Sequence, residues 1–224
     1  EIRIRESSMI LDTRFELKDL QSLSSLESLS GWSAQGRAAL TWNAASGALS
    51  SRAQGTIRPS AGVSPLFSGK EIPFSATASL ENGTVLNVSG LEIAVPWGTL
   101  RGDGTWDLAQ ESLKATWHLA LPALDVFSAR LKGGPAEVSA TVQGPLTALA
   151  LSADAVGRDL GVSGLDFGTV RASLQAELGA ATKGNVKADM HWKEMAWRGR
   201  TDFDWSNHRL TLTKIFLEDG DSTL

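Results

Sequence analysis

Several features that many proteins carry are missing from this 224-residue sequence. It has no tyrosine and no cysteine, and the absence of cysteine excludes a disulfide framework and a thiolate metal site. It has no run of about 18 apolar residues, the length that a bilayer-crossing helix needs. Lysine and arginine occur singly and the formal net charge is −4. The chain therefore lacks the basic stripe of a nucleic-acid-binding protein and the polybasic patch of a membrane-surface protein.

The two ends of the chain also lack landmarks. Residues 1–5 (EIRIR) already alternate as a strand does, where a signal peptide would have a basic start and an apolar stretch. Residues 210–224 read as a strand pattern that is interrupted. We therefore expect this sequence to be a segment of a longer protein, with any targeting signal outside it.

What the sequence does contain is a two-residue periodicity along most of its length, typical of strands with one dry and one wet face. The clearest stretch places apolar side chains at every second position, namely Leu113, Ala115, Trp117, Leu119 and Leu121. Three further sets follow the same rule: Phe74, Ala76, Ala78 and Leu80; Val138, Ala140 and Val142; Val170, Ala172, Leu174, Ala176 and Leu178.

Short turn sequences separate these runs at intervals of about ten residues, which predicts about fifteen antiparallel strands. The turns that we predict are Ala45–Gly47, Asn82-Gly83, Gly102–Gly104, Lys183–Asn185 and Ser206–His208. No helical pattern alternates with the strands, so the fold class is all-β, a long antiparallel meander. One short helix is predicted over residues 19–29, where Leu20, Leu23 and Leu26 lie three residues apart. A helix this short needs packing, and we expect it to cap the dry face of the sheet.

The sequence contains a weak internal repeat, which we call the internal echo. Residues 86–100 align with residues 210–224 without a gap, so that Leu86, Val88 and Leu91 meet Leu210, Leu212 and Ile215. We interpret residues 1–224 as a single elongated β domain that consists of two stacked repeats, roughly residues 1–100 and 101–224.

No catalytic or metal-binding pattern emerges. His191 lies near Asp189 and Glu194 at strand spacing, which is not the helical spacing of a zinc protease motif. No serine lies in the sequence context of a hydrolase nucleophile. We therefore predict a protein that is not an enzyme and that uses no cofactor and no metal.

Three segments resemble the TamB/AsmA-like family, which includes the inner-membrane subunit of the bacterial translocation and assembly module. They are Asp19–Leu40, with D-L-x-x-L-x-x-L and L-S-G; Gly98–Leu119, with G-T-L-R-G-D-G-T-W-D-L; and Val142–Leu165, with V-Q-G-P-L-T-A-L-A-L. The resemblance is one of pattern and covers most of the chain. It implies a β-sheet folded along its length into an open, taco-like groove with one or two short helices. It also implies a periplasmic location in a protein anchored to the bacterial inner membrane.

The same resemblance implies a function in phospholipid transport between the inner and outer membranes, in outer-membrane protein assembly, or in both. The outer-membrane β-barrel partner of the module would bind regions outside this segment. Physical reasoning points the same way, since an acyl chain needs a continuous dry path without charge. We predict that the four alternating sets named above line this groove, and that their many alanines leave room for acyl chains.

Two alternatives stay open. The chain could be a scaffold or chaperone that adds its sheet edge to the strands of outer-membrane β-barrel proteins. It could also be a glycan-binding β-sandwich, which an exposed cluster of three or more tryptophans on the wet face would favour. The dry faces could equally pack on each other as an ordinary core.

Overall fold

The computed structural model describes residues 2–5, 8–18, 32–59, 70–179, 182–192, 195–206 and 209–219. All regular structure in these ranges is β-strand, which confirms the predicted all-β class. The helix predicted over residues 19–29 lies outside the described residues. Fifteen strands follow one another along the chain: β1 (Ile2–Arg5), β2 (Ser8–Leu17), β3 (Ser33–Asn43), β4 (Leu49–Arg58), β5 (Ile72–Glu81), β6 (Val85–Val95), β7 (Gly98–Asp107), β8 (Ser112–Leu121), β9 (Leu131–Lys132), β10 (Ala136–Pro145), β11 (Leu149–Val162), β12 (Leu165–Leu178), β13 (Thr182–Trp192), β14 (Met195–Ser206) and β15 (Arg209–Asp219).

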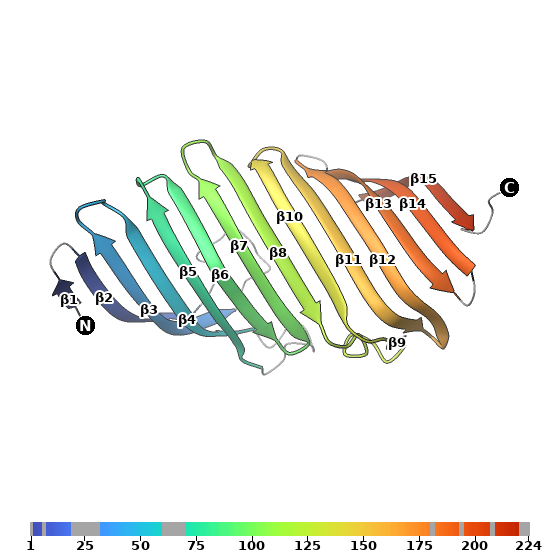
Figure 1. The fold of residues 1–224 in the computed structure, drawn as a ribbon, viewed down its shortest axis with the longest axis horizontal. Helices are drawn as coiled ribbons and strands as arrows, with labels where there is room; N and C mark the ends of the chain where they lie inside the picture. Colours follow the sequence, from blue (N-terminus) through green and yellow to red (C-terminus); the bar gives the residue numbers. More distant parts are fainter. Residues whose placement is uncertain are drawn as a thin grey trace. The chain divides into compact units, whose positions relative to one another are not determined.

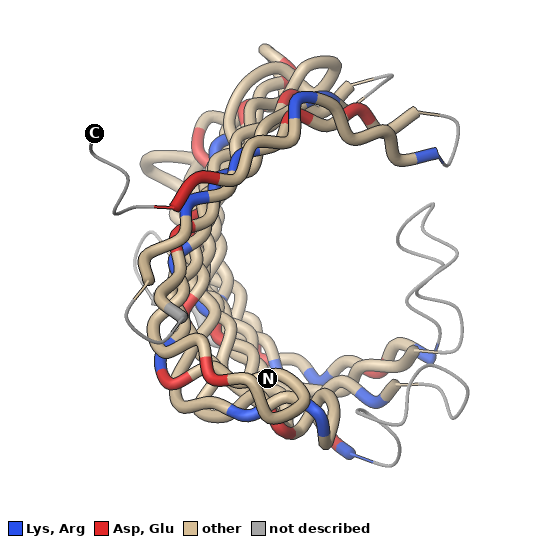
Figure 2. The backbone as a smooth tube through the Cα atoms, turned by 90° about the vertical axis from the view of Figure 1, so that its right-hand side faces the viewer, with Lys and Arg blue, Asp and Glu red and all other residues tan. Residues whose placement is uncertain are grey.

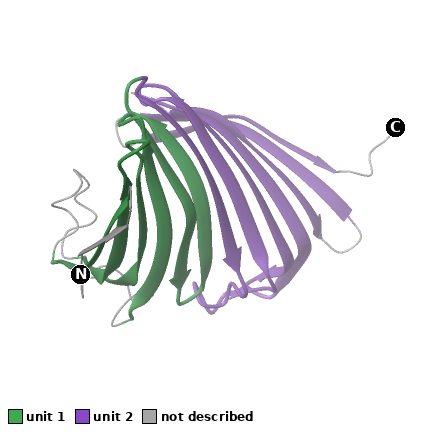
Figure 3. Cartoon of the chain, turned by 60° about the vertical axis from the view of Figure 1, so that its left-hand side comes forward, with its two compact units in different colours: residues 1–109 green, residues 110–224 purple. Residues whose placement is uncertain are grey.

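The chain divides into two compact units, residues 1–109 and 110–224. Unit 1 holds β1 to β7, and each strand pairs antiparallel with the next one (Figure 1). Unit 2 holds β8 to β15, where β8 pairs with β10 and the short β9 pairs with β11. Each unit is a curved, open antiparallel sheet, green or purple in Figure 3.

The strand registers bring the sequence alternation into line across each unit. In unit 1, Leu40 of β3 pairs with Leu11 of β2 and with Ser51 of β4. In unit 2, Val138 of β10 pairs with Leu119 of β8 and with Ala155 of β11. Since neighbouring residues that pair point to the same side of a sheet, each unit has one apolar face and one polar face.

Burial is confined to the apolar faces. Among the described residues, six hydrophobic ones are buried, and all of them lie at apolar-face positions: Ala34, Ile72, Ala115, Leu121, Ala136 and Ala176. Most other apolar-face side chains are half-buried, because no second sheet or helix among the described residues covers them.

Two distant bulges occupy equivalent positions of the internal echo. In β6, the register shifts between Val88 and Leu91, and Gly90 has a φ of 59°. In β15, the register shifts opposite Arg200 and Asp202, and Lys214 has a φ of 52°. Gly90 and Lys214 are aligned residues in the gapless echo. Each bulge inserts one extra residue, so that apolar side chains on both sides of it stay on the same face.

The turn predictions were correct in part. Asn82 and Gly83 adopt positive φ angles of 51° and 72°, and Gly47 has a φ of 68°. The predicted turn at Gly102–Gly104 was wrong, because these residues lie inside β7. Lys183–Asn185 likewise lie inside β13, where Gly184 faces the ring of Phe203. Residues 207 and 208 lie outside the described residues.

Candidate binding surfaces: the two apolar faces

The apolar face of unit 2 is built from seven strands in continuous rows. One row crosses the whole unit at one residue per strand: Leu119, Val138, Ala155, Ala172, Ala188, Gly199 and Leu217. Its members are small in the middle and large at the two ends. A row with this profile forms a shallow floor, since alanine and glycine extend little from the backbone.

The predicted lining residues of unit 2 share this face. Leu113, Ala115, Trp117, Leu119 and Leu121 of β8 pair with β10, where Val138, Ala140 and Val142 lie. The predicted residues of β12 lie on the same face, because β12 pairs with β11 and β11 pairs with β10; they are Val170, Ala172, Leu174, Ala176 and Leu178. The sequence analysis did not name the connecting β11 residues Leu151, Ala153 and Ala155, whereas Val186, Ala188 and Met190 of β13 follow the alternation that it described. The alternation L-A-L-S-A-D-A in β11 was a usable signal for the first three.

Unit 1 has a corresponding face. The predicted residues Phe74, Ala76, Ala78 and Leu80 all lie on it, on β5. The neighbouring positions come from β3, β4 and β6, and include Leu40, Ala53 and Val88. A middle row of small residues runs across four strands: Thr13, Ala38, Ala53 and Ala76.

Between β2 and β7 and between β8 and β14, no described residue at the aligned apolar-face positions is charged, and the charged exception in unit 2 is Asp219 of β15, which pairs with Trp197. In unit 2, the polar exceptions between β8 and β14 are the hydroxyls of Thr182 and Thr201. In unit 1, they are the hydroxyls of Thr13 and Ser51. A hydroxyl is far less costly than a charge beside an apolar ligand, so both faces are compatible with hydrocarbon.

Charges are instead spread over the polar faces. Figure 2 shows basic and acidic residues interspersed along the backbone. Arg198 pairs with Asp189 at 3.6 Å, and Lys183 pairs with Asp204 at 3.6 Å. The pairs are solvent-exposed, so they contribute little to stability.

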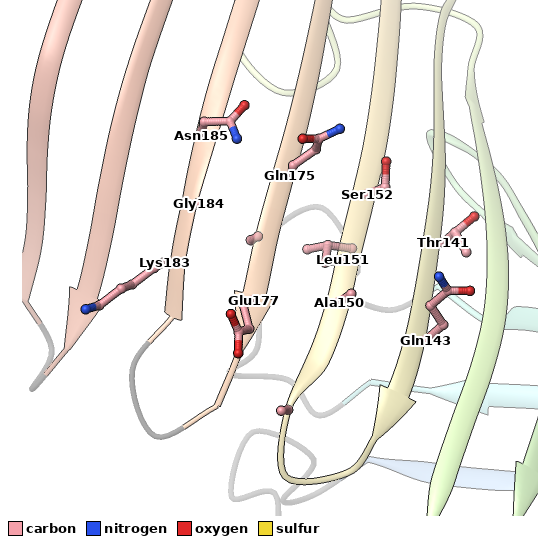
Figure 4. A pocket seen from close by; sticks show the side chains of 12 residues that line it. Thr141, Gln143, Ala150, Leu151, Ser152, Gln175, Glu177, Lys183, Gly184 and Asn185 are labelled. Carbon is pink, nitrogen blue, oxygen red and sulfur yellow. The ribbon is translucent and has the colours of Figure 1, made fainter.

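A shallow depression of about 530 Å³ also lies on the polar face of unit 2. Figure 4 shows side chains of Thr141, Ser152, Gln175 and Asn185 around it, which occupy one register row of β10 to β13. Glu177 and Lys183 stand at its side. The lining mixes these polar and charged side chains with small or apolar residues such as Ala148, Ala150 and Leu151, and it is open to solvent.

The described tryptophan side chains do not form the glycan-type cluster that the sequence left open. Trp42, Trp106, Trp117, Trp197 and Trp205 all fall at apolar-face register positions. None of the described strands presents a group of three tryptophans on its polar face. The aromatic side chains are therefore available to the apolar faces rather than to a sugar on the wet side.

Side chains that could act in catalysis or bind a metal do not cluster in the described part of the chain. The His118 Nδ1 lies 3.1 Å from the Ser139 Oγ, on the exposed polar face. The described residues hold no group of three or more metal-ligating His, Cys, Asp or Glu side chains. No described helix is long and apolar enough to cross a membrane.

The last strand presents a different kind of surface. Every residue of β15 is exposed, and Ile215 and Leu217 have exposed fractions of 64 % and 67 %. Its inner edge pairs with β14, while no described strand pairs with its outer edge. An exposed, apolar strand edge is a template for pairing with another strand.

Comparisons with protein-family models, curated proteins and solved structures found no match to this chain.

Proposed function

We propose that the apolar faces bind phospholipid acyl chains, and that the chain is a periplasmic segment of a TamB-like envelope protein. It would conduct lipid between the inner and outer membranes, support outer-membrane protein assembly, or do both. The observation that carries the proposal is an apolar face that spans the aligned strands of each unit and has no charged residue at its described positions between β2 and β7 or between β8 and β14. The mechanism is passive and needs no catalytic residue, cofactor or metal.

The energetics of a one-sided sheet suit a transported ligand. Burying a methylene is worth about 0.8 kcal/mol. A sheet that covers only one side of an acyl chain gains roughly half of this, about 0.4 kcal/mol for each methylene. Over a whole acyl chain the binding free energy sums to several kcal/mol, which is enough to hold a lipid and small enough to let it move. The polar head group stays in water.

The small residues of the floor favour a ligand over self-packing. The middle of the unit 2 row consists of Ala155, Ala172, Ala188 and Gly199. A sheet that fills its own core would use larger aliphatic side chains at such positions. Alanine and glycine instead leave space above the sheet that an acyl chain could fill.

The experiment is to purify the full chain without detergent and to quantify extracted phospholipid by mass spectrometry. A matched sample, unfolded in denaturant, freed of lipid and refolded, gives the background and then serves for reloading from vesicles. The proposal predicts about one or more phospholipids per chain before stripping and recovery after reloading. A folded chain that carries no lipid in either sample would contradict it.

A second candidate function rests on a separate observation, the exposed outer edge of β15. In this alternative the chain is a scaffold that adds its edge to the strands of outer-membrane β-barrel proteins. The test adds a peptide with the alternating pattern of a barrel strand and measures amide hydrogen exchange in β15. Slower exchange of β15 amides, absent with a scrambled peptide of equal composition, supports augmentation. Unchanged exchange counts against it.

A further inference from the structure

The two margins of the unit 1 apolar face differ in exposure. One margin, which we name the Trp42 margin, is a continuous register row along the hairpin ends: Met9, Trp42, Leu49, Leu80, Leu86 and Trp106. Within it, Met9, Trp42, Leu49 and Trp106 have exposed fractions of 40 %, 44 %, 37 % and 39 %. Large apolar side chains are thus left in contact with water along one side of the face.

The opposite margin, which we name the closed margin, is more buried. Its row contains Leu17, Ala34, Ile57 and Ile72, and the exposed fractions of Ala34 and Ile72 are 7 % and 2 %. Trp32 precedes β3 at this end and Trp97 lies in the β6–β7 turn, and the indole nitrogens of both are buried. The unit therefore has tryptophans at both margins: Trp42 and Trp106 are exposed at one margin, and Trp32 and Trp97 are half-buried at the other.

Tryptophan has an apolar body and one N–H donor, which is why it concentrates where hydrocarbon meets water. Trp42 and Trp106 occupy such a boundary. The apolar floor begins beside them, and the polar turns that start at Asn43 and Asp107 follow them directly. The Asn43 side chain accepts hydrogen bonds from the backbone N–H groups of Ala45 and Ser46, and the Asp107 side chain accepts one from that of Ala109.

The dimensions of the face fit a lipid that starts at this margin. From Trp42 to Ala38 are four residues, or about 13 Å of strand. An acyl chain spans about half of the 30 Å hydrocarbon core of a bilayer, or about 15 Å. An acyl chain that enters at Trp42 and runs parallel to the strands would end near the middle row of Ala38, Ala53 and Ala76, where the side chains are single methyl groups. The closed margin would stay beyond its reach.

From these observations, and resting on the proposed function, we infer that the Trp42 margin is the entry side of unit 1. The glycerol and head group of a bound phospholipid lie beside Trp42 and Trp106. The acyl chains extend from there over the alanine row.

The experiment uses the full chain loaded with phosphatidylcholine that carries bromine either near the glycerol end or near the methyl end of its acyl chains. Bromine quenches tryptophan fluorescence at short range. Three proteins are compared: the unsubstituted chain, the W42F/W106F variant, and the W32F/W97F variant as a matched control from the opposite margin. Both variants keep the same number of tryptophans, and bound lipid per chain is measured in parallel by mass spectrometry.

We expect glycerol-end bromine to quench more strongly than methyl-end bromine in the unsubstituted chain. The W42F/W106F variant should lose more than half of this difference, while the W32F/W97F variant should keep it. If the difference survives in W42F/W106F, or vanishes in W32F/W97F, while lipid remains bound, the entry side is wrong and the proposed function stands. If no lipid is bound by the unsubstituted chain, the proposed function itself fails.

Discussion

The rings of Phe15 and Phe74 meet with their centroids 6.4 Å apart although two strands separate them. Phe15 is on β2 and Phe74 is on β5, and the register row between them contains Gly36 and Gly55. Because both intervening residues lack side chains, the two rings lie over the bare backbone and touch. The contact links β2 to β5 across β3 and β4 on the apolar face of unit 1.

This arrangement predicts a large cost for adding a methyl group beneath the rings. A Cβ on Gly36 would lie 2.3 Å from the Gln54 carbonyl oxygen and 2.8 Å from the Phe15 ring. We expect Gly36→Ala to lower the free energy of unfolding by about 2 to 3 kcal/mol, as measured by urea denaturation. Gly199→Ala is the control, since its Cβ would meet Leu217 at an ordinary 3.5 Å. Equal costs for the two variants would contradict the packing role of Gly36.

A substitution at Gly90 tests the effect of backbone conformation alone, because an added side chain would not clash with any neighbour. The φ of Gly90 is 59°, and a Cβ there would have no atom within 4 Å. The Asp103 side chain also accepts a hydrogen bond from the backbone N–H of Gly90 at 2.8 Å. We expect Gly90→Ala to cost about 1 kcal/mol of stability and Gly90→Asn to cost less, because asparagine tolerates positive φ. Thermal unfolding measures both, and a neutral Gly90→Ala would argue against the bulge.

The unequal margins of unit 1 predict unequal truncation costs. Ile72 is 2 % exposed, whereas Leu49 on the adjacent strand and the same face is 37 % exposed. Ile72→Ala should cost about 2 to 4 kcal/mol. Leu49→Ala should cost less, about 1 kcal/mol, since more than a third of the Leu49 surface already meets water. Chemical denaturation of the lipid-free protein gives both values, and a Leu49→Ala cost as large as that of Ile72→Ala would mean that the exposed margin is packed.

Ion pairs of the polar face should matter little. The Arg198 and Asp189 side chains are 70 % and 59 % exposed at a separation of 3.6 Å. Asp189→Asn is therefore expected to change the free energy of unfolding by less than about 0.5 kcal/mol. Urea denaturation at low and high salt checks this, and a salt-dependent loss of more than 1 kcal/mol would show a coupled network instead.

The sequence predicted the strands better than it predicted their irregularities. The run Leu113–Leu121 alternates so regularly that its apolar face could be read directly, and β8 (Ser112–Leu121) matches it. Gly184 was predicted in a turn because glycine is common there, yet it lies in β13 where the Phe203 ring leaves no room for a side chain. Whether a glycine serves a turn or a ring contact depends on pairing with a distant strand, which local pattern does not encode.

The bulge at Lys214 shows a second limit. No propensity rule places a lysine at a φ of 52°. The alignment of Lys214 with Gly90 was nevertheless present in the sequence echo. For the candidate site, composition and period placed residues such as Ala172 on a dry face. The exposed Trp42 margin could not be read from the sequence, because exposure depends on which margin the rest of the chain encloses.

The most direct test of the account compares two adjacent residues that point to opposite faces. Ala172 lies on the apolar face and Ser173 on the polar face of β12, and both are half-buried. Phospholipid bound per chain is measured by mass spectrometry in Ala172→Asp and in Ser173→Asp, with circular dichroism to verify folding. Ala172→Ser serves as a milder variant should the aspartate at that position prevent folding. The account predicts that Ser173→Asp retains its lipid and that a folded Ala172 variant loses a substantial part of it. Full lipid occupancy in folded Ala172→Asp, or equal loss in both aspartate variants, would contradict binding of acyl chains to the apolar face.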